Sequence, residues 1–183
     1  KSKTHDVMYT RLLNVLQVSL CFLVLSPIFV AVGHVDHDHL LCRKCGNEVT
    51  ENYIENFINI TSTQSEQVKI VALYGHSNVT VQTLRNPANN VFELVTLKVA
   101  GCTGVGKWYS EHTWFPDYSW KVCVCPRCKA HLGWVFEPST RALAEPSQSK
   151  ASSEGFYALI LGRLISEDFS DSLVIGLPKI HQY

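Results

Sequence analysis

Apolar residues in this chain gather mainly in short runs separated by turn-forming residues. Each run is rich in Val, Leu, Thr and aromatic residues, and Gly, Pro, Asn or Ser residues bound it, a pattern typical of strands. The runs cover residues 68–74, 79–84, 91–100, 120–124 and 133–136. Between Val91 and Val99 the alternate positions on one side are nearly all apolar, which predicts an antiparallel strand with one buried face. The pattern predicts a mainly β domain.

The pattern weakens toward the C-terminus. Residues 138–153 consist largely of turn formers and small residues, and they predict a polar loop. From Gly155 to Ile165 the apolar and aromatic pattern returns and predicts a closing strand. We expect residues 167–183 to form a tail, in which the apolar patch 173–177 either docks on the domain or frays.

The longest apolar run lies near the N-terminus, from about Leu12 to Phe29. Arg11 precedes this run and small residues follow it at 31–33, which is the order found in a signal peptide. We therefore expect residues 8–33 to be a signal peptide, with residues before Met8 upstream of the start, and the product to be secreted. The run is also long enough for a signal anchor, so a membrane partner is expected only if the segment stays uncleaved.

Charge excludes one class of partner. After residue 33 the chain contains 13 Lys and Arg against 15 Asp and Glu, so the net charge of the expected mature chain is near −2. This balance leaves no basic footprint for nucleic acid. Residues 34–39 form a leader rich in His and Asp; loose metal binding is an alternative, but we favour a solvated leader because no hydrophobic pattern fixes the imidazoles.

Two glycosylation acceptors agree with secretion. They are the N-x-[ST] sequons Asn59-Ile60-Thr61 and Asn78-Val79-Thr80. Sequons of this length are frequent by chance, so we expect N-glycosylation at Asn59 and Asn78 only if the chain is secreted.

Four of the six cysteines after residue 33 form two C-x-x-C pairs, Cys42/Cys45 and Cys125/Cys128. Turn residues accompany each pair, and this spacing is typical of a closed tetrahedral zinc site with four thiolate ligands. A disulfide framework is the alternative, because the secretory route is oxidising and six cysteines allow 15 pairings. Two C-x-x-C disulfides would be strained, so we favour one structural Zn²⁺ ion.

Cys102 and Cys123 remain outside these pairs. Two interpretations stay open for them: a disulfide that joins two strands, or a pair of buried free thiols.

Aromatic residues concentrate around Pro116. Residues 112–120 read His-Thr-Trp-Phe-Pro-Asp-Tyr-Ser-Trp, and the proline forces a turn between Trp114 and Trp120. Trp134 and Phe136 lie two positions apart, so on a strand they share a face. The rings can meet as an aromatic cage or as ordinary core, and composition alone favours core because Trp is bulky and apolar.

The order of these motifs resembles the CULT domain family, the thalidomide-binding domain of cereblon, over about residues 40–166. The resemblance lies in WFPDYSW at 114–120 and CPRCKAHLGWVF at 125–136, preceded by the first C-x-x-C pair and Asn86-Pro87. It implies a β-tent fold, in which two roughly perpendicular antiparallel sheets join near a structural four-cysteine zinc site. It also implies a binding pocket and no enzyme activity.

The resemblance further implies which residues bind a ligand. Trp114, Trp120 and Trp134 would wall a slot for a cyclic imide or a uridine-like ring, with Phe136 at its base. Backbone groups of His112 and Trp114 would hydrogen-bond the imide, and Asn86 and Pro87 would border the entrance. An aromatic cage also suits a cation, so a quaternary amine is a further candidate. Because we expect secretion, we do not expect a ubiquitin ligase adaptor as a partner.

Two other functions stay open. Methionine sulfoxide reductases of the B type have a similar β-tent core and zinc site, but they need a reactive cysteine in the aromatic pocket. Cys102 and Cys123 are the only candidates, since no cysteine follows Cys128. The other alternative is a structural secreted domain, in which the indoles fill the core and bind no ligand.

Overall fold

The computed structural model describes residues 39–50 and 53–175. The predicted signal peptide and most of the leader lie outside these residues. Among the described helices, none has the length and apolar character needed to cross a membrane.

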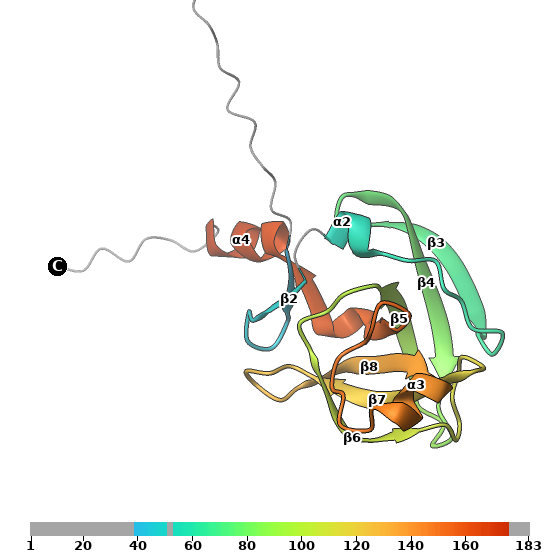
Figure 1. The fold of residues 1–183 in the computed structure, drawn as a ribbon. Coiled ribbons are helices and arrows are strands. Elements are labelled where there is room, and N and C mark those ends of the chain that lie inside the picture. The colour runs from blue at the N-terminus through green and yellow to red at the C-terminus, as the bar shows by residue number, and fades with distance from the viewer. Residues whose placement is uncertain (1–38, 51–52, 176–183) are drawn as a thin grey trace, which may run out of the picture. The chain divides into compact units, whose positions relative to one another are not determined.

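The described chain is mainly β and forms two antiparallel sheets (Figure 1). The smaller sheet has the order β10-β1-β2 and the larger has the order β3-β4-β5-β9-β8-β7-β6. The smaller sheet consists of β1 (Leu40–Cys42), β2 (Glu48–Thr50) and β10 (Leu164–Ser166). The larger sheet consists of β3 (Gln67–Leu73), β4 (His76–Arg85), β5 (Val91–Leu97), β6 (Thr103–Tyr109), β7 (Tyr118–Val124), β8 (His131–Pro138) and β9 (Phe156–Ile160). The predicted fold class is confirmed in these terms, while the angle between the sheets stays a prediction.

Two helices lie in segments for which the sequence predicted no helix. The first, α3 (Ser139–Ala144), lies against β7 and β8 in Figure 1, and the second is α4 (Glu167–Ile175). The other short helical segments are α2 (Tyr53–Asn56) and η1 (Leu161–Arg163), and the latter divides the expected closing strand into β9 and β10. The predicted loop is therefore wrong at residues 139–144, and a helix that was not predicted occupies residues 167–175 of the expected tail, whose boundary stays a prediction.

Both helices have local causes. In α3, the guanidinium of Arg141 lies 3.4 Å from Glu137 at the end of β8 and 3.3 Å from Glu145 at the C-cap, so it bridges the two ends of the helix. In α4, Ser166 precedes the first turn and its hydroxyl accepts a hydrogen bond from the Phe169 N–H at 3.3 Å. Glu167 adds a favourable negative charge near the N-terminus of that helix.

Apolar residues cover the larger sheet on both faces. One face packs with the smaller sheet through residues such as Val95, Leu97 and Leu40, and the other carries an aromatic cluster that includes Leu94 and Phe136. Residues 94–97 of β5 are consequently all buried. The prediction of a single buried face for this strand is wrong, because packed segments lie on both sides of it.

Strand register places the aromatic residues of the candidate site on one face. Trp120 is opposite Phe136 across β7 and β8, and Val122 is opposite Trp134. Since side chains alternate along a strand, these rings point to one side of the sheet, while Lys121 and Glu137 point to the other. Trp134 and Phe136 thus share a face, as their spacing predicts.

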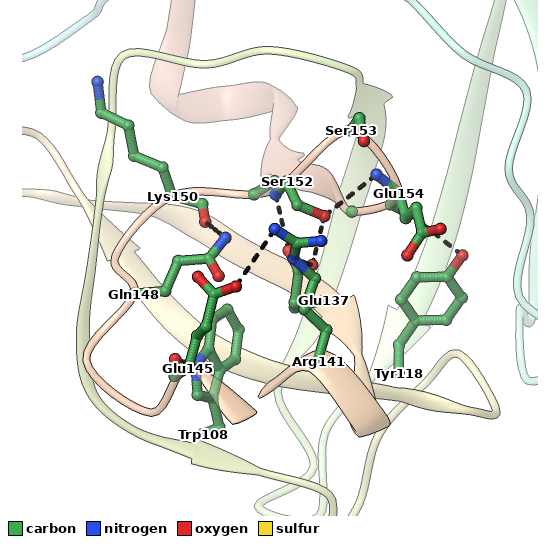
Figure 2. A network of polar contacts seen from close by, with 12 residues as sticks. Trp108, Tyr118, Glu137, Arg141, Glu145, Gln148, Lys150, Ser152, Ser153 and Glu154 are labelled. Carbon is green, nitrogen blue, oxygen red and sulfur yellow. Dashed lines mark hydrogen bonds and ion pairs between the residues drawn. The ribbon is translucent and has the colours of Figure 1, made fainter. Parts of the chain in front are cut away.

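Two buried charged residues hold the segment after β8 against the face opposite the aromatic rings. The carboxylate of Glu137 accepts hydrogen bonds from the backbone N–H of Ser152, at 2.8 Å, and from the Ser152 hydroxyl (Figure 2). The Lys121 ammonium donates to the carbonyl oxygens of Pro146, at 2.9 Å, and Gln148, at 2.7 Å, and burial lowers its pKa. These bonds compensate the burial of both charges and fix the 139–155 segment behind β7 and β8.

Candidate functional site

The two C-x-x-C pairs meet at one point although they lie far apart in the sequence. The Sγ atoms of Cys42, Cys45, Cys125 and Cys128 all lie within 4.8 Å of one another. Two short turns present them: the N–H of Gly46, in a left-handed conformation, donates to the Cys42 carbonyl at 2.8 Å, and the N–H of Lys129 donates to the Cys125 carbonyl at 3.0 Å. The cluster therefore joins the end of β1 to the turn between β7 and β8.

The sulfur positions fit a tetrahedral zinc site. A Zn–S bond of about 2.3 Å implies a separation of about 3.8 Å between two sulfurs of a tetrahedron. The Cys42–Cys128 and Cys45–Cys125 sulfurs are each 3.7 Å apart, and all four cysteines are unbridged. This geometry argues against the disulfide alternative for these residues and identifies a four-cysteine cluster that could hold a metal ion.

The ionisation of the thiols differs around the cluster. Burial raises the pKa of Cys42 to about 12, whereas the backbone N–H of Ala130 lowers the pKa of Cys128 to about 7. Metal ligation requires thiolates, so an incoming ion must displace the Cys42 proton.

Cys102 and Cys123 form a disulfide, with 5.6 Å between their Cα atoms, and both are buried. The bond ties the residue before β6 to the C-terminal end of β7. The first of the two predicted alternatives is therefore confirmed.

The disulfide gives the first testable prediction. We expect the Cys102→Ala/Cys123→Ala double variant to lower the free energy of unfolding by about 2–4 kcal/mol, because the bond restricts the unfolded chain. Guanidinium denaturation of both proteins, under non-reducing conditions and with equal zinc content, measures the difference. An unchanged unfolding midpoint would show that the bridge contributes nothing to stability.

A cavity of about 270 Å³ lies on the aromatic face of the larger sheet. The described residues that line it are Asn86, Pro87, Ala88, His112, Trp114, Trp120, Trp134 and Phe136. The structure thus brings all seven residues predicted for the ligand site around one pocket. It adds Ala88, which follows Asn86 and Pro87 in the connection between β4 and β5.

Two of the indoles are packed against each other, and the third is more open. Trp114 and Trp134 meet edge to face with ring centroids 4.8 Å apart, and they are only 6% and 7% exposed. Trp120 is half-buried and stacks on Tyr109 at 5.0 Å. The rings therefore belong partly to the core, but their packing leaves a cavity between them.

Phe92 and Tyr109 support the aromatic cage without lining the cavity, and neither was predicted from the sequence as part of the site. The Phe92 ring lies 5.0 Å from that of Trp134. The alternation along β5 places Phe92 on the aromatic face, but only the tertiary structure shows which ring it contacts.

Internal hydrogen bonds orient two of the cage rings. The indole N–H of Trp114 donates to the Arg85 carbonyl at 2.9 Å, and that of Trp120 donates to the Glu111 carbonyl at 3.0 Å. These donors are already used, so the polar edge of a ligand would need partners from the other residues around the cavity, which include Asn86 and His112. His112 has a φ of 57°, which turns the chain at the pocket wall.

A buried glutamine fixes the wall that carries Trp114. The Gln82 side-chain oxygen accepts from the Ser62 N–H at 2.9 Å, and its amide donates to the Ile60 carbonyl at 3.0 Å. The Ser62 hydroxyl then donates to the Trp114 carbonyl, and Gln64 donates to the Thr113 carbonyl at 2.9 Å. The 58–65 segment thus connects β4 to the backbone beside the pocket.

His131 connects the turn that carries Cys125 and Cys128 to the aromatic cage. It lies three residues after Cys128, and its ring meets that of Trp134 edge to face at 4.6 Å. Its Nε2 lies 2.9 Å from the Gly133 carbonyl, and burial lowers its pKa, so the ring is neutral near pH 7. The position of Trp134 therefore depends on the turn that the four-cysteine cluster holds.

Comparison with known proteins finds similarity to cereblon. No family model matches the chain. Protein cereblon of Danio rerio is 31% identical over 85 residues, which are 46% of this chain and 19% of that protein. The cereblons of Gallus gallus and Xenopus tropicalis are 32% identical over 60 residues and 36% identical over 52 residues, covering 32% and 28% of this chain and 14% and 12% of those proteins. The matches thus span about a fifth or less of these relatives, and the chain is similar to part of cereblon in a way that is consistent with a CULT domain.

Proposed function

We propose that this chain is a secreted, zinc-stabilised binding module whose aromatic pocket takes a cyclic imide-like or uridine-like ligand. The observation that carries the proposal is the cavity of about 270 Å³ between three indoles. The similarity to part of cereblon supports a pocket of this kind.

The pocket size favours a small ligand that inserts one flat ring. Sites for drug-sized molecules usually measure about 300–1,000 Å³, and this cavity lies just below that range. A flat ring gains from burial between indole faces, and its C(=O)–NH–C(=O) edge needs both donors and acceptors. The turn backbone beside His112 and Trp114 can provide them, at about 1 kcal/mol for each net hydrogen bond.

The cysteine cluster and the disulfide support the same proposal. The four clustered cysteines would hold one Zn²⁺ ion, which would act as a structural centre and leave no open coordination position for chemistry. The Cys102–Cys123 disulfide suits an oxidising compartment and favours secretion. A secreted module would not meet a ubiquitin ligase adaptor, and its membrane attachment would depend on an uncleaved signal segment at residues 8–33.

The reductase alternative has little support from the pocket. No cysteine occurs among the described residues that line it, and the two cysteines outside the cluster in the described part of the chain, Cys102 and Cys123, are joined in a buried disulfide. A methionine sulfoxide reductase assay with dithiothreitol tests this directly, and we expect no turnover.

Calorimetry on folded, zinc-loaded protein tests the proposed function. We expect glutarimide or uridine to bind, and N-methylglutarimide to bind about tenfold more weakly or worse, because the methyl group removes the imide donor and leaves its partner unpaired. Tetramethylammonium tests the cation alternative. If no ring compound binds to the folded protein, the proposed function is wrong and the structural-domain alternative gains support.

Ser62 provides a prediction about the pocket wall. We expect Ser62→Ala to weaken ring binding about fivefold, because loss of roughly 1 kcal/mol of hydrogen bonding frees the Trp114 backbone. Ser65→Ala is the matched control. The Ser65 hydroxyl donates to the side-chain oxygen of Gln82 and makes no hydrogen bond to the backbone of the pocket wall. Equal affinities for the two variants, measured by calorimetry, would show that the wall needs no such support.

A further inference from the structure

The edge strand β3 carries an exposed apolar row. Val68 is 49% exposed and Ile70 is 70% exposed, and Ala72 continues the same alternation. Val68 is opposite Gln82 and Ile70 is opposite Thr80 on the neighbouring strand β4. The row therefore lies on the face of the larger sheet that also carries the aromatic pocket.

Two features make this row prone to pair with the strand of a second chain. An edge strand presents unpaired backbone groups, and natural proteins usually defend such edges with charges, proline or a covering segment. The one charged residue within β3, Lys69, points to the other face, where it pairs with Glu93 at 2.6 Å. The 58–65 segment covers β4 on this face but leaves Val68 and Ile70 exposed.

Both sequon asparagines lie on the face of this row. Asn78 is exposed on β4, and its neighbour Val79 points into the core on the opposite side. Asn59 is exposed in the 58–65 segment, and its Oδ1 accepts a hydrogen bond from Thr80 at 2.8 Å. That bond uses the oxygen of Asn59 and not its Nδ2, the atom that glycosylation modifies.

We propose that Asn78 and Asn59 carry N-linked glycans that cover the apolar row of β3. The reaction joins the side-chain Nδ2 to C1 of the first N-acetylglucosamine of an oligosaccharide on a lipid diphosphate donor. The bond between C1 and the diphosphate oxygen breaks, the lipid diphosphate leaves, and the amide loses one proton. The hydrated glycans then shield Val68 and Ile70 and keep a second copy from pairing with the strand edge. This inference rests on the secretion that belongs to the proposed function.

Expression of the full chain in a eukaryotic secretory host tests the modification. We expect the secreted protein to lose the mass of two glycans after treatment with peptide-N-glycosidase. Asn78→Gln should remove one of them, whereas Ser77→Gln, the matched control at the adjacent exposed position, should keep both because it preserves the sequon. A secreted chain with Asn78 unmodified, or a chain that is not secreted, overturns the inference.

Sedimentation velocity tests the shielding. We expect Asn78→Gln to self-associate at concentrations where the glycosylated chain is monomeric, and Ile70→Lys to restore the monomer in the Asn78→Gln background. An Asn78→Gln protein that stays monomeric would overturn the shielding. Ligand calorimetry on unglycosylated protein tests the pocket separately, so failure of the glycan inference and failure of the binding proposal are distinguishable.

Discussion

Replacement of Cys125 by serine is expected to abolish stoichiometric zinc binding and to lower the free energy of unfolding by several kcal/mol or more. Structural zinc contributes about 10–16 kcal/mol in small sites, which is comparable with the 5–15 kcal/mol that usually stabilises a whole domain. The cluster of Cys42, Cys45, Cys125 and Cys128 joins β1 to the turn between β7 and β8. Loss of the metal should therefore release the smaller sheet from the larger one.

Metal analysis and guanidinium denaturation of the purified proteins measure this effect. Arg127→Ala is the matched control, because it changes the same turn and removes one exposed hydrogen bond to the Cys45 carbonyl but keeps all four thiols. We expect the control to bind zinc and to lose less than about 1 kcal/mol. A metal-free Cys125→Ser protein with wild-type stability would show that the cluster holds no structural ion.

The second large effect is expected from Trp120→Ala, which should weaken ring binding by about tenfold to hundredfold. Stacking of a ring on an aromatic side chain contributes about 1–3 kcal/mol, and the half-buried Trp120 supplies an open wall of the pocket. The variant should remain folded, since Trp120 is less buried than Trp114 and Trp134.

Trp108→Ala is the matched control for this variant. The Trp108 ring lies 4.6 Å from the Lys121 ammonium, on the sheet face opposite the pocket, and does not line the cavity. We expect it to keep full affinity in the same calorimetric titration, although it removes an equal amount of aromatic surface. Similar losses in both variants would mean that general destabilisation, and not a pocket wall, explains the effect.

Much of the larger sheet was predictable because its strands alternate or cluster apolar residues. The strands β1 and β2 were missed since three residues are too few to show a period. Strand β6 was missed because its edge position leaves most of its residues exposed and two of them are glycines. Ser166 followed by acidic residues is a helix-start signal that identifies α4, and the tail interpretation overlooked it.

The candidate site also contains some residues that the sequence predicted and others that it could not predict. Cysteine spacing alone predicted the cluster, because two C-x-x-C turns present sulfurs to one point. The pocket residues followed from the resemblance, since composition favoured ordinary core. Ser62 and Gln82 could not be identified, because polar residues acquire a positioning role only when the fold brings their segments together. The burial of Lys121 and Glu137 could not be predicted either, since Lys and Glu side chains are usually exposed.

Side-chain contacts connect the four-cysteine cluster to the aromatic pocket. Cys128 and His131 belong to the turn that leads into β8, and His131 packs on Trp134. On the other side, Ser62 holds the backbone of Trp114. The cage is thus fixed from two directions, and we expect metal removal to reduce ring binding before the larger sheet unfolds.

A crystal structure of the zinc-loaded protein soaked with glutarimide or uridine tests the central claim most directly. The account predicts density for one ring between Trp114, Trp120 and Trp134, with its polar edge toward the backbone at His112 and Trp114, and a metal ion bound by four sulfurs. Indoles that close over the cavity and leave no density for a ring, in crystals with saturating ligand, would contradict it.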